Sequence, residues 1–136
     1  EKDAQQLAVI RQLVRDLHFA VEIVGHPTIR EPDGLAMSSR NALLSPSERT
    51  AATVLVRALH NAEDAIGTGQ RAARIIREVM LDTLRSEPLC QPDYAEVVDA
   101  TDFQPVERLR GRVVLPIAAR FGATRLLDNL QLTLST

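Results

Sequence analysis

The sequence is poor in aromatic residues and in cysteine. Only 3% of its 136 residues are aromatic and none is Trp, so the core must be built from Leu, Ile, Val and Ala. Such a composition favours helices packed on aliphatic strands. The single cysteine, Cys90, excludes an internal disulfide and has no metal-ligand spacing around it. The expected compartment is therefore the cytoplasm.

Excess charge and long apolar runs are also missing. The 16 basic and 18 acidic residues give a net charge of −2, which provides no bulk field for a nucleic-acid partner. No uncharged apolar run approaches the roughly 20 residues of a membrane span. The three histidines, His18, His26 and His60, are scattered, so the sequence predicts no metal site.

The chain is 45% apolar and 25% charged, as expected for one globular domain or two small pieces sharing a core. It opens on Glu1-Lys2-Asp3 without Met and enters a helical pattern within three residues, so we expect a part of a longer protein. Asp3 and Gln6 have the form of a capping box, which predicts a helix over 3–17. The β-branched run 19–25 predicts a mostly buried strand, and helix followed by buried strand indicates α/β architecture.

After a long loop over 27–45, the pattern becomes helical again. Ser45-Pro46-Ser47-Glu48 is a typical helix start, and Gly67-Thr68-Gly69 supplies the stop. A second helix follows, so we expect a helical hairpin. The apolar positions of the two helices are Ala51, Leu55, Leu59, Ala62 and Ile66 in the first, and Ala72, Ile76, Val79 and Met80 in the second.

Three strands are predicted beyond the hairpin, over 93–98, 112–120 and 125–134. Neighbouring strands of this kind favour an antiparallel sheet, and the alternation of Leu and polar residues in the last strand predicts one solvated face. The chain therefore divides near residue 42 into the end of an α/β domain and a small α+β domain.

The loop between the two parts carries Ser38, Ser39 and Arg40 in succession. Two hydroxyls beside the fixed fork of an arginine form a compact set of hydrogen-bond donors for phosphate oxygens. The alternative is that Pro-Asp-Gly makes a turn, that the Ser-Ser-Arg-Asn run caps the next element, and that nothing binds. On composition alone the second interpretation is favoured.

The start of the chain is the other candidate. Lys2 at a helix N-terminus could bind an anion, Asp3 could accept hydrogen bonds from ribose hydroxyls, and Gln6 could bind a hydroxy acid. The alternative is that Asp3 and Gln6 only cap the helix. Neither cluster is decisive by itself.

Three stretches together resemble one family. They are Glu-Lys-Asp-Ala-Gln-Gln-Leu at 1–7, the run from Val24 to Asn41 that contains Gly-Leu-Ala-Met-Ser-Ser-Arg-Asn, and Thr-Arg-Leu-Leu-Asp-Asn at 124–129. The chain is similar in these stretches to the pantothenate synthetase (pantoate–β-alanine ligase) family, while residues 46–92 match only in pattern. The resemblance implies that residues 1–42 end a Rossmann-like nucleotidyl-transferase domain and that 43–136 form a small α+β C-terminal lid domain, with the helical hairpin and a three-stranded antiparallel sheet.

The resemblance also implies a cytoplasmic ligase of coenzyme A precursor synthesis, homodimeric when complete. Such an enzyme activates pantoate with Mg²⁺ and ATP to pantoyl adenylate and pyrophosphate, after which the amine of β-alanine displaces AMP. Ser38, Ser39 and Arg40 would lie on a mobile loop that closes on the triphosphate. The other implied contacts are Lys2 with phosphate, Asp3 with ribose, Glu1 in the same nucleotide-contacting turn, Ile29 and Met37 with adenine, and Gln6 with the pantoate hydroxyls.

The family's first phosphate-binding motif and most of its substrate pocket would lie upstream of Glu1. We therefore expect this chain alone to be inactive. Two alternatives remain open at this point. The chain could be a non-catalytic lid that self-associates through uncovered apolar faces, or part of another adenylate-forming nucleotidyl transferase.

Overall fold

The computed structural model describes residues 15–16, 30–36 and 38–134. Residues 15 and 16 are helical, as predicted, while the rest of the predicted helix 3–17 and the predicted strand 19–25 lie outside the described residues. The named elements are the 3₁₀ helix η1 (Ser39–Leu43), the helices α2 (Pro46–Ala51), α3 (Val54–Gly67) and α4 (Ala73–Arg85), and the strands β1 (Gln91–Ala95), β2 (Val98–Asp99), β3 (Gly111–Phe121) and β4 (Thr124–Leu134).

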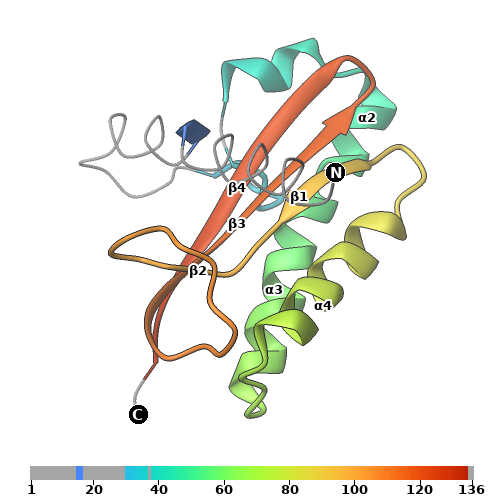
Figure 1. Ribbon diagram of the computed structural model, residues 1–136. Helices are drawn as coiled ribbons and strands as arrows, with labels where there is room; N and C mark the ends of the chain where they lie inside the picture. Colours follow the sequence, from blue (N-terminus) through green and yellow to red (C-terminus); the bar gives the residue numbers. More distant parts are fainter. Residues whose placement is uncertain (1–14, 17–29, 37, 135–136) are drawn as a thin grey trace, which may run out of the picture.

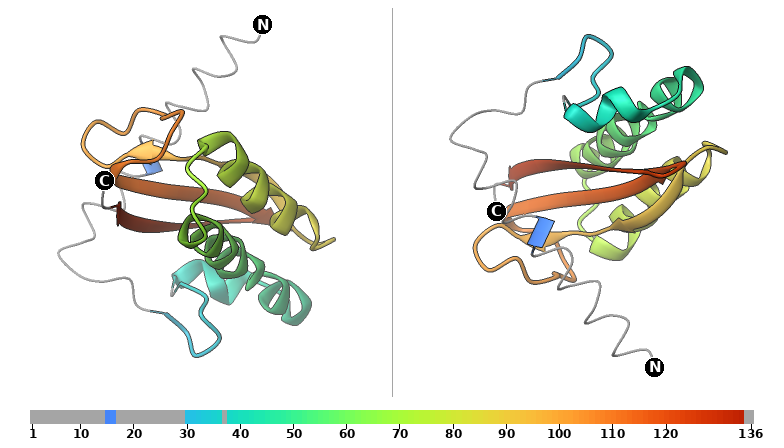
Figure 2. Two further views of the ribbon diagram at one scale, coloured as in Figure 1. Left: turned by 90° about the horizontal axis from the view of Figure 1, so that it is seen from below. Right: turned by 90° about the horizontal axis from the view of Figure 1, so that it is seen from above.

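The described part of the chain has α/β architecture, with one antiparallel sheet and a helical hairpin. Strand β3 is central: β4 pairs along one edge of it, and β1 and β2 pair with it by antiparallel ladders of their own. The helices α3 and α4 pack together against one face of this sheet (Figures 1 and 2). The predicted hairpin and the predicted antiparallel pairing are thus confirmed.

The strand predicted over 93–98 is interrupted, so the sheet has four strands rather than three. Ala95 lies opposite Ile117 and Val98 lies opposite Val114, which places Glu96 opposite Pro116. The backbone N–H of Glu96 donates to the carbonyl of Pro116 over 3.1 Å, but proline has no N–H to donate in return. The ladder therefore breaks at this point, and β1 and β2 form on either side of it.

The helix predicted from residue 46 onward is also divided. Its start is confirmed: the hydroxyl of Ser45 accepts from the N–H of Glu48, and the carboxylate of Glu48 accepts from the N–H of Ser45. The hydroxyls of Thr50 and Thr53 then donate to the carbonyls of Pro46 and Thr50, at 3.2 and 2.8 Å. Hydroxyls that bond to carbonyls of the preceding turn bend helices, and α2 ends before Thr53.

The main core lies between the hairpin and the sheet, and it is aliphatic, as the composition predicts. All five apolar positions predicted for the first helix are buried. Of those predicted for the second, Ile76 and Met80 are buried, while Val79 and Ala72, the N-cap of α4, are half-buried. The sheet contributes alternate side chains of β3: Val113, Leu115, Ile117, Ala119 and Phe121.

The opposite face of the sheet is only partly solvated. A second cluster of buried side chains lies there, formed by Tyr94, Val98, Val114 and Ala118. The prediction of a solvated face holds at the end of β4, where Gln131 and Thr133 are exposed, and is wrong around Tyr94. Strand β3 is buried on both faces between Val113 and Ala119.

The turn between β3 and β4 gives a stability prediction. Gly122 has φ +65°, and a Cβ placed there would collide with the carboxylate of Glu48, which forms the capping box of α2. Gly111 has φ +64° but open space around it. We expect Gly111→Ala to cost about 1–2 kcal/mol, the left-handed penalty alone. Gly122→Ala should cost about 1 kcal/mol more, because the cap of α2 is disturbed.

Thermal and urea unfolding of the two variants measure this difference. Gly111→Ala is the matched control for backbone strain. Equal destabilisation by the two substitutions would contradict the proposed contact between Gly122 and Glu48.

Candidate functional site

The loop that carries the predicted phosphate-binding residues begins with a tight turn over 30–36. The N–H of Glu31 donates to the carbonyl of Leu35 over 2.8 Å, and the N–H of Gly34 donates to the carbonyl of Glu31 over 2.9 Å. Gly34 has φ +94°, a conformation that glycine adopts at little cost. Leu35 is only 1% exposed and joins the main core. The turn predicted at Pro-Asp-Gly is thus confirmed, and it is packed against the C-terminal part.

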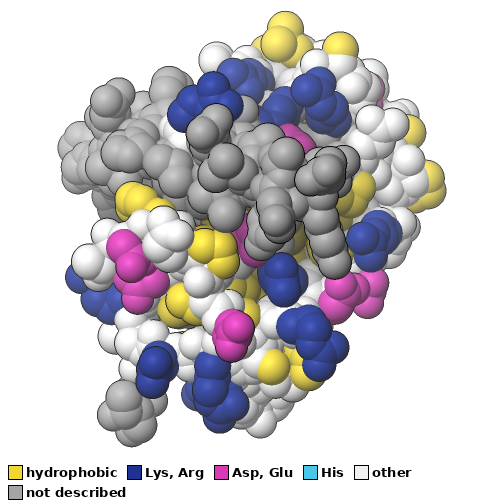
Figure 3. Space-filling model, in the orientation of Figure 1, with side chains coloured by type: hydrophobic (Ala, Val, Ile, Leu, Met, Phe, Trp, Pro, Cys, Tyr) yellow, Lys and Arg dark blue, Asp and Glu magenta, His cyan; other side chains and the backbone are white. Residues whose placement is uncertain are grey.

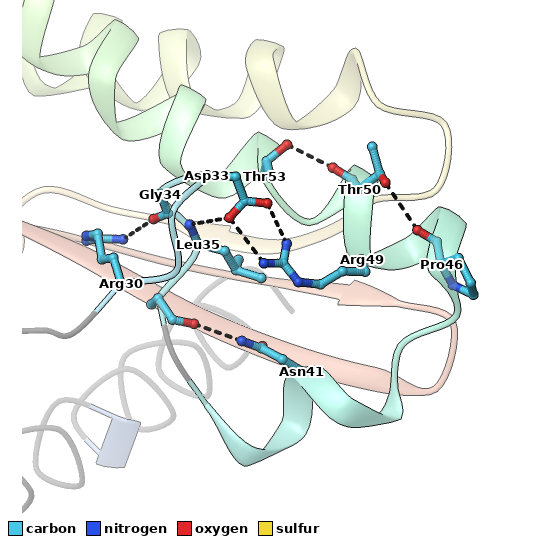
Figure 4. Close-up of polar contacts among 10 residues, drawn as sticks. Arg30, Asp33, Gly34, Leu35, Asn41, Pro46, Arg49, Thr50 and Thr53 are labelled. Carbon is cyan, nitrogen blue, oxygen red and sulfur yellow. Dashed lines mark hydrogen bonds and ion pairs between the residues drawn. The ribbon is translucent and has the colours of Figure 1, made fainter.

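Two ion pairs hold this turn in place. The guanidinium of Arg30 binds both carboxylate oxygens of Asp128, at 2.8 and 2.9 Å, and also donates to the carbonyl of Gly34. Asp33 accepts two hydrogen bonds from Arg49, at 2.8 and 3.1 Å (Figure 4). The side chain of Asp128 is 2% exposed and that of Asp33 is 45% exposed. The pair with Asp128 is therefore the stronger anchor, since exposed pairs contribute little.

Each of the two ion pairs shifts a pKa so that the charged form of the side chain is favoured. The hydrogen bonds from Arg49 hold the pKa of Asp33 below its ordinary value. The hydrogen bonds to Asp128 raise the pKa of Arg30 above its ordinary value. The charged forms are favoured in both cases, so the turn stays anchored across the neutral pH range.

The Ser38-Ser39-Arg40 run lies next to this anchored turn and is exposed. The hydroxyl of Ser38 accepts from the N–H of Arg40 over 3.1 Å and caps η1. The guanidinium of Arg40 donates to the carbonyl of Arg125, also over 3.1 Å. The side-chain amide of Asn41 donates to the carbonyl of Ala36, while its buried oxygen has no partner among the described residues (Figure 4).

The geometry of the Ser38-Ser39-Arg40 run bears on both interpretations of it. The turn and the cap that the simpler interpretation predicts are present. The donors that the phosphate-binding interpretation needs are present too, because both serines and the arginine face solvent on a fixed segment. The remaining predicted site residues lie outside the described residues: Glu1, Lys2, Asp3, Gln6, Ile29 and Met37.

A second polar cluster surrounds Arg125, to which the sequence analysis assigned no role. The guanidinium of Arg125 donates to Asp16 through both terminal nitrogens, at 3.1 and 3.4 Å, and to Asp93 through Nε at 2.7 Å. Tyr94 donates its hydroxyl proton to Asp16 over 2.8 Å, and the guanidinium lies 5.8 Å from the centre of the Tyr94 ring. Burial, together with the hydrogen bond to Asp16, raises the pKa of Tyr94, so its hydroxyl stays protonated.

The only sequence signal for this cluster is the stretch 124–129, which contains both Arg125 and Asp128 and contributes to the family resemblance. The acidic partner Asp16 is 109 residues away along the chain. A pair so distant in sequence cannot be found from periodicity.

A groove of about 430 Å³ lies between α4 and β1. Its charged lining includes Glu96, whose carboxylate is 3.6 Å from the guanidinium of Arg77. Burial raises the pKa of Glu96 above its ordinary value, and Arg77 only partly offsets this. The folded state therefore binds the proton of Glu96 more tightly than the unfolded chain does.

Because the pKa of Glu96 is raised in the folded state, we expect Glu96→Gln to stabilise the fold by an amount that depends on pH. The Glu96 carboxylate disfavours the folded state once the pH rises above the raised pKa, and it ceases to do so below the ordinary value of 4.5. Glu96→Gln should therefore melt at a higher temperature than the parent at pH 7, with the difference shrinking toward pH 4. Glu78→Gln, on an exposed side chain of the same groove, is the control. A lower melting temperature for Glu96→Gln at pH 7 would mean that the pair with Arg77 outweighs burial.

Charged side chains of both signs are interspersed on the face in Figure 3. Among the described residues, no group of three or more His, Cys, Asp or Glu side chains could hold a metal ion. Within the same residues, no helix is long and apolar enough to cross a lipid bilayer.

Comparison with known proteins identifies the family. The sequence profile described as Pantoate-beta-alanine ligase matches residues 1–131. The chain is 50% identical over 130 residues to the pantothenate synthetase of Heliobacterium modesticaldum and 52% identical over 131 residues to that of Herpetosiphon aurantiacus. These matches cover 96% of the chain but 46% and 48% of the relatives, so the chain spans about half the length of the curated relatives it matches.

The structure agrees with the sequence comparison. A crystal structure of pantothenate synthetase from Thermus thermophilus matches with a TM-score of 0.74 and 39% identity, covering 94% of this chain and 46% of that one. The family profile spans both the anchored turn over 30–36 and the part of β4 that carries Arg125 and Asp128. The chain belongs to the pantoate–β-alanine ligase family.

Proposed function

We propose that the complete protein containing this chain condenses pantoate with β-alanine to pantothenate, with ATP as the activating substrate. The observation that carries the proposal is the family match over residues 1–131, within which the exposed Ser38-Ser39-Arg40 run lies on an anchored loop. The relatives named pantothenate synthetase support the same reaction. The other products are AMP and pyrophosphate.

The proposed domain arrangement follows from the resemblance and from the packing. Residues 1–42 end a Rossmann-like ATP-binding domain, and 43–136 form the C-terminal lid domain. The separate core between the α3–α4 hairpin and the sheet supports the second domain. Leu35 lies in that core, so the turn over 30–36 packs against the C-terminal part.

In the proposed ATP site, Arg40 and Lys2 bind phosphate oxygens, and Ser38 and Ser39 add neutral donors. Asp3 binds the ribose, and Glu1 lies in the same nucleotide-contacting turn. Ile29 and Met37 border the adenine, and Gln6 binds the hydroxyls of pantoate. Arg40 suits its role because it is exposed and donates only one hydrogen bond within the described residues, which leaves further N–H groups for phosphate.

The first step is the attack of a pantoate carboxylate oxygen on the α-phosphorus of ATP. The bond from the α-phosphorus to the bridging oxygen breaks, and negative charge moves onto the leaving pyrophosphate. Cationic side chains that are fixed before the reaction stabilise this charge without reorganising. In the second step the amine of β-alanine attacks the acyl carbon and AMP leaves. No side chain of this chain acts as a nucleophile.

Magnesium enters the proposal with the nucleotide. In sites of this kind Mg²⁺ is held largely by substrate phosphates and water, so we assign it no ligand from this chain. We further propose that the complete protein is a cytoplasmic homodimer without nucleic-acid or membrane partners. The closing lid would hold two anionic substrates together and keep water from the acyl adenylate.

The test compares the complete protein with residues 1–136 alone. With pantoate, β-alanine and Mg-ATP, the complete protein should form pantothenate and AMP in equal amounts, and the chain alone should form neither. Turnover by the chain at the rate of the complete protein would contradict the assignment of half the active site to upstream residues. Activation of a different acid, with pantoate inert, would support another adenylate-forming transferase instead.

A further inference from the structure

We call the first six residues of β4, Thr124–Asn129, the β4 anchor. These residues contact three segments that precede the sheet in sequence. Arg125 and Asp128 lie three positions apart on the strand, so their side chains project from opposite faces of the sheet. Asp128 lies on the face that packs against the hairpin, beside buried Leu126. Arg125 lies on the other face, against the ring of Tyr94.

On the hairpin face, the anchor holds the loop. Asp128 binds Arg30 with both oxygens and also accepts from the backbone N–H of Asn129 over 2.7 Å. Three donors thus fix a carboxylate that is 2% exposed. The first residue of the loop that leads to Ser38 is therefore tied to β4.

On the opposite face, the anchor holds the helical residue Asp16. The side chains of Arg125 and Asp16 are 17% and 13% exposed, and all three guanidinium nitrogens of Arg125 donate to Asp16 or Asp93. The hydroxyl of Tyr94 adds a fourth hydrogen bond. A planar guanidinium whose three nitrogens all donate hydrogen bonds cannot be replaced by the single ammonium of lysine.

The backbone of Arg125 contacts Arg40. The guanidinium of Arg40 donates to the carbonyl of Arg125 over 3.1 Å, so Arg125 contacts both Asp16 and the proposed phosphate-binding arginine. Asp16 lies in the helix predicted over 3–17, and Asp3, at the predicted start of that helix, is a proposed nucleotide contact.

We propose that the β4 anchor fixes Arg40 relative to Asp16 and so positions the proposed phosphate-binding arginine for the triphosphate of ATP. Arg125 and Asp128 are positioning residues, with no contact to substrate. This inference rests on the proposed function in so far as Arg40 binds the triphosphate. Its structural part, the fixing of residues 38–44 by Arg125, does not depend on the reaction.

The kinetic test uses the complete protein with Arg125→Gln, Arg40→Ala and the double variant. Pantoate-dependent exchange between ATP and pyrophosphate should fall about 10- to 100-fold in kcat/KM for ATP in Arg125→Gln, the range for a misplaced catalytic group. Arg40→Ala should cost much less in the Arg125→Gln background than in the parent, because loss of the contacts with Asp16 and Asp93 shifts the backbone carbonyl of residue 125 to which Arg40 donates. Arg120→Gln is the matched control, since Arg120 is exposed and lies directly opposite Arg125 on β3.

The second readout is hydrogen exchange at the backbone N–H groups of Arg40, Asn41 and Leu44, which bond within the loop. Arg125→Gln should accelerate their exchange, and Arg120→Gln should not. If Arg125→Gln does not fold, Tyr94→Phe removes only the hydroxyl that binds Asp16 and should shift both readouts in the same direction.

Two results would overturn the proposal: effects of Arg125→Gln and Arg40→Ala that simply multiply, or unchanged exchange at residues 38–44. A merely structural Arg125 would lower the melting temperature and leave both readouts as in the parent. If the parent protein shows no pantoate-dependent exchange, the proposed function fails, and the hydrogen-exchange measurement still decides whether the anchor fixes the loop.

Discussion

Arg40→Ala in the complete protein is expected to slow formation of the acyl adenylate by about 10- to 100-fold. A hydrogen bond to a charged group contributes about 1.5–3 kcal/mol, and each 1.36 kcal/mol corresponds to a factor of ten in rate. The loss falls on the first step, in which charge moves onto pyrophosphate. Single-turnover pyrophosphate release, with pantoate present and β-alanine omitted, isolates that step.

The fold should survive this substitution. Arg40 is exposed, and its one hydrogen bond to protein within the described residues goes to the carbonyl of Arg125. Arg57→Ala, at an exposed position on α3, controls for the loss of a surface arginine. An unchanged rate of pyrophosphate release would remove Ser38-Ser39-Arg40 from the site, and the phosphate role would then have to lie elsewhere.

Asp128→Ala should cause the largest loss of stability among the polar substitutions considered. It removes a carboxylate that is 2% exposed and leaves the guanidinium of Arg30, which is 30% exposed, without its partner. Removing one partner of such a pair should lower the free energy of unfolding by about 3 kcal/mol. This value is the lower end of the range for buried pairs, because Arg30 remains partly hydrated. The melting temperature should fall by roughly 10 °C.

Asp33→Ala is the matched control, because Asp33 is also bound by both nitrogens of an arginine. The pair of Asp33 with Arg49 is exposed, so its loss should change the melting temperature little. Equal losses for the two variants would contradict the role of Asp128 as the main anchor of the loop.

The parts of the fold that local chemistry determines could be predicted from the sequence. The Ser45–Glu48 capping box, the turn before Leu35 and the buried stripe of α3 all depend on residues within a few positions of one another. The same holds for the β3–β4 hairpin, whose Gly122 sits in the two-residue turn. Each feature is a short-range pattern with a known backbone consequence.

The features that were missed depend on partners distant in sequence. Strand 93–98 breaks because Pro116 lies opposite Glu96, which no property of residues 93–98 reveals. The second buried face follows from the packing of Tyr94 against β3. Asp128 and Arg30 are 98 residues apart and Arg125 and Asp16 are 109 apart, so these two ion pairs of the β4 anchor could not be predicted from spacing.

The candidate site divides in the same way. The residue types of Ser38, Ser39 and Arg40 indicate phosphate chemistry, and the structure adds that they are exposed on a segment fixed by β4. The predicted contacts of Lys2, Asp3 and Gln6 remain predictions. They require the position of the helix start relative to Arg40, which depends on tertiary contacts.

The most direct test of the proposed adenylate mechanism follows an oxygen atom of the pantoate carboxylate. The complete protein is supplied with pantoate labelled with ¹⁸O in the carboxylate, together with β-alanine and Mg-ATP, and the products are separated by mass spectrometry. Attack of the carboxylate on the α-phosphorus predicts one ¹⁸O in the phosphate of AMP. Label in inorganic phosphate with ADP as coproduct, or AMP without label, would contradict the proposed adenylate and with it the placing of Arg40 on the triphosphate.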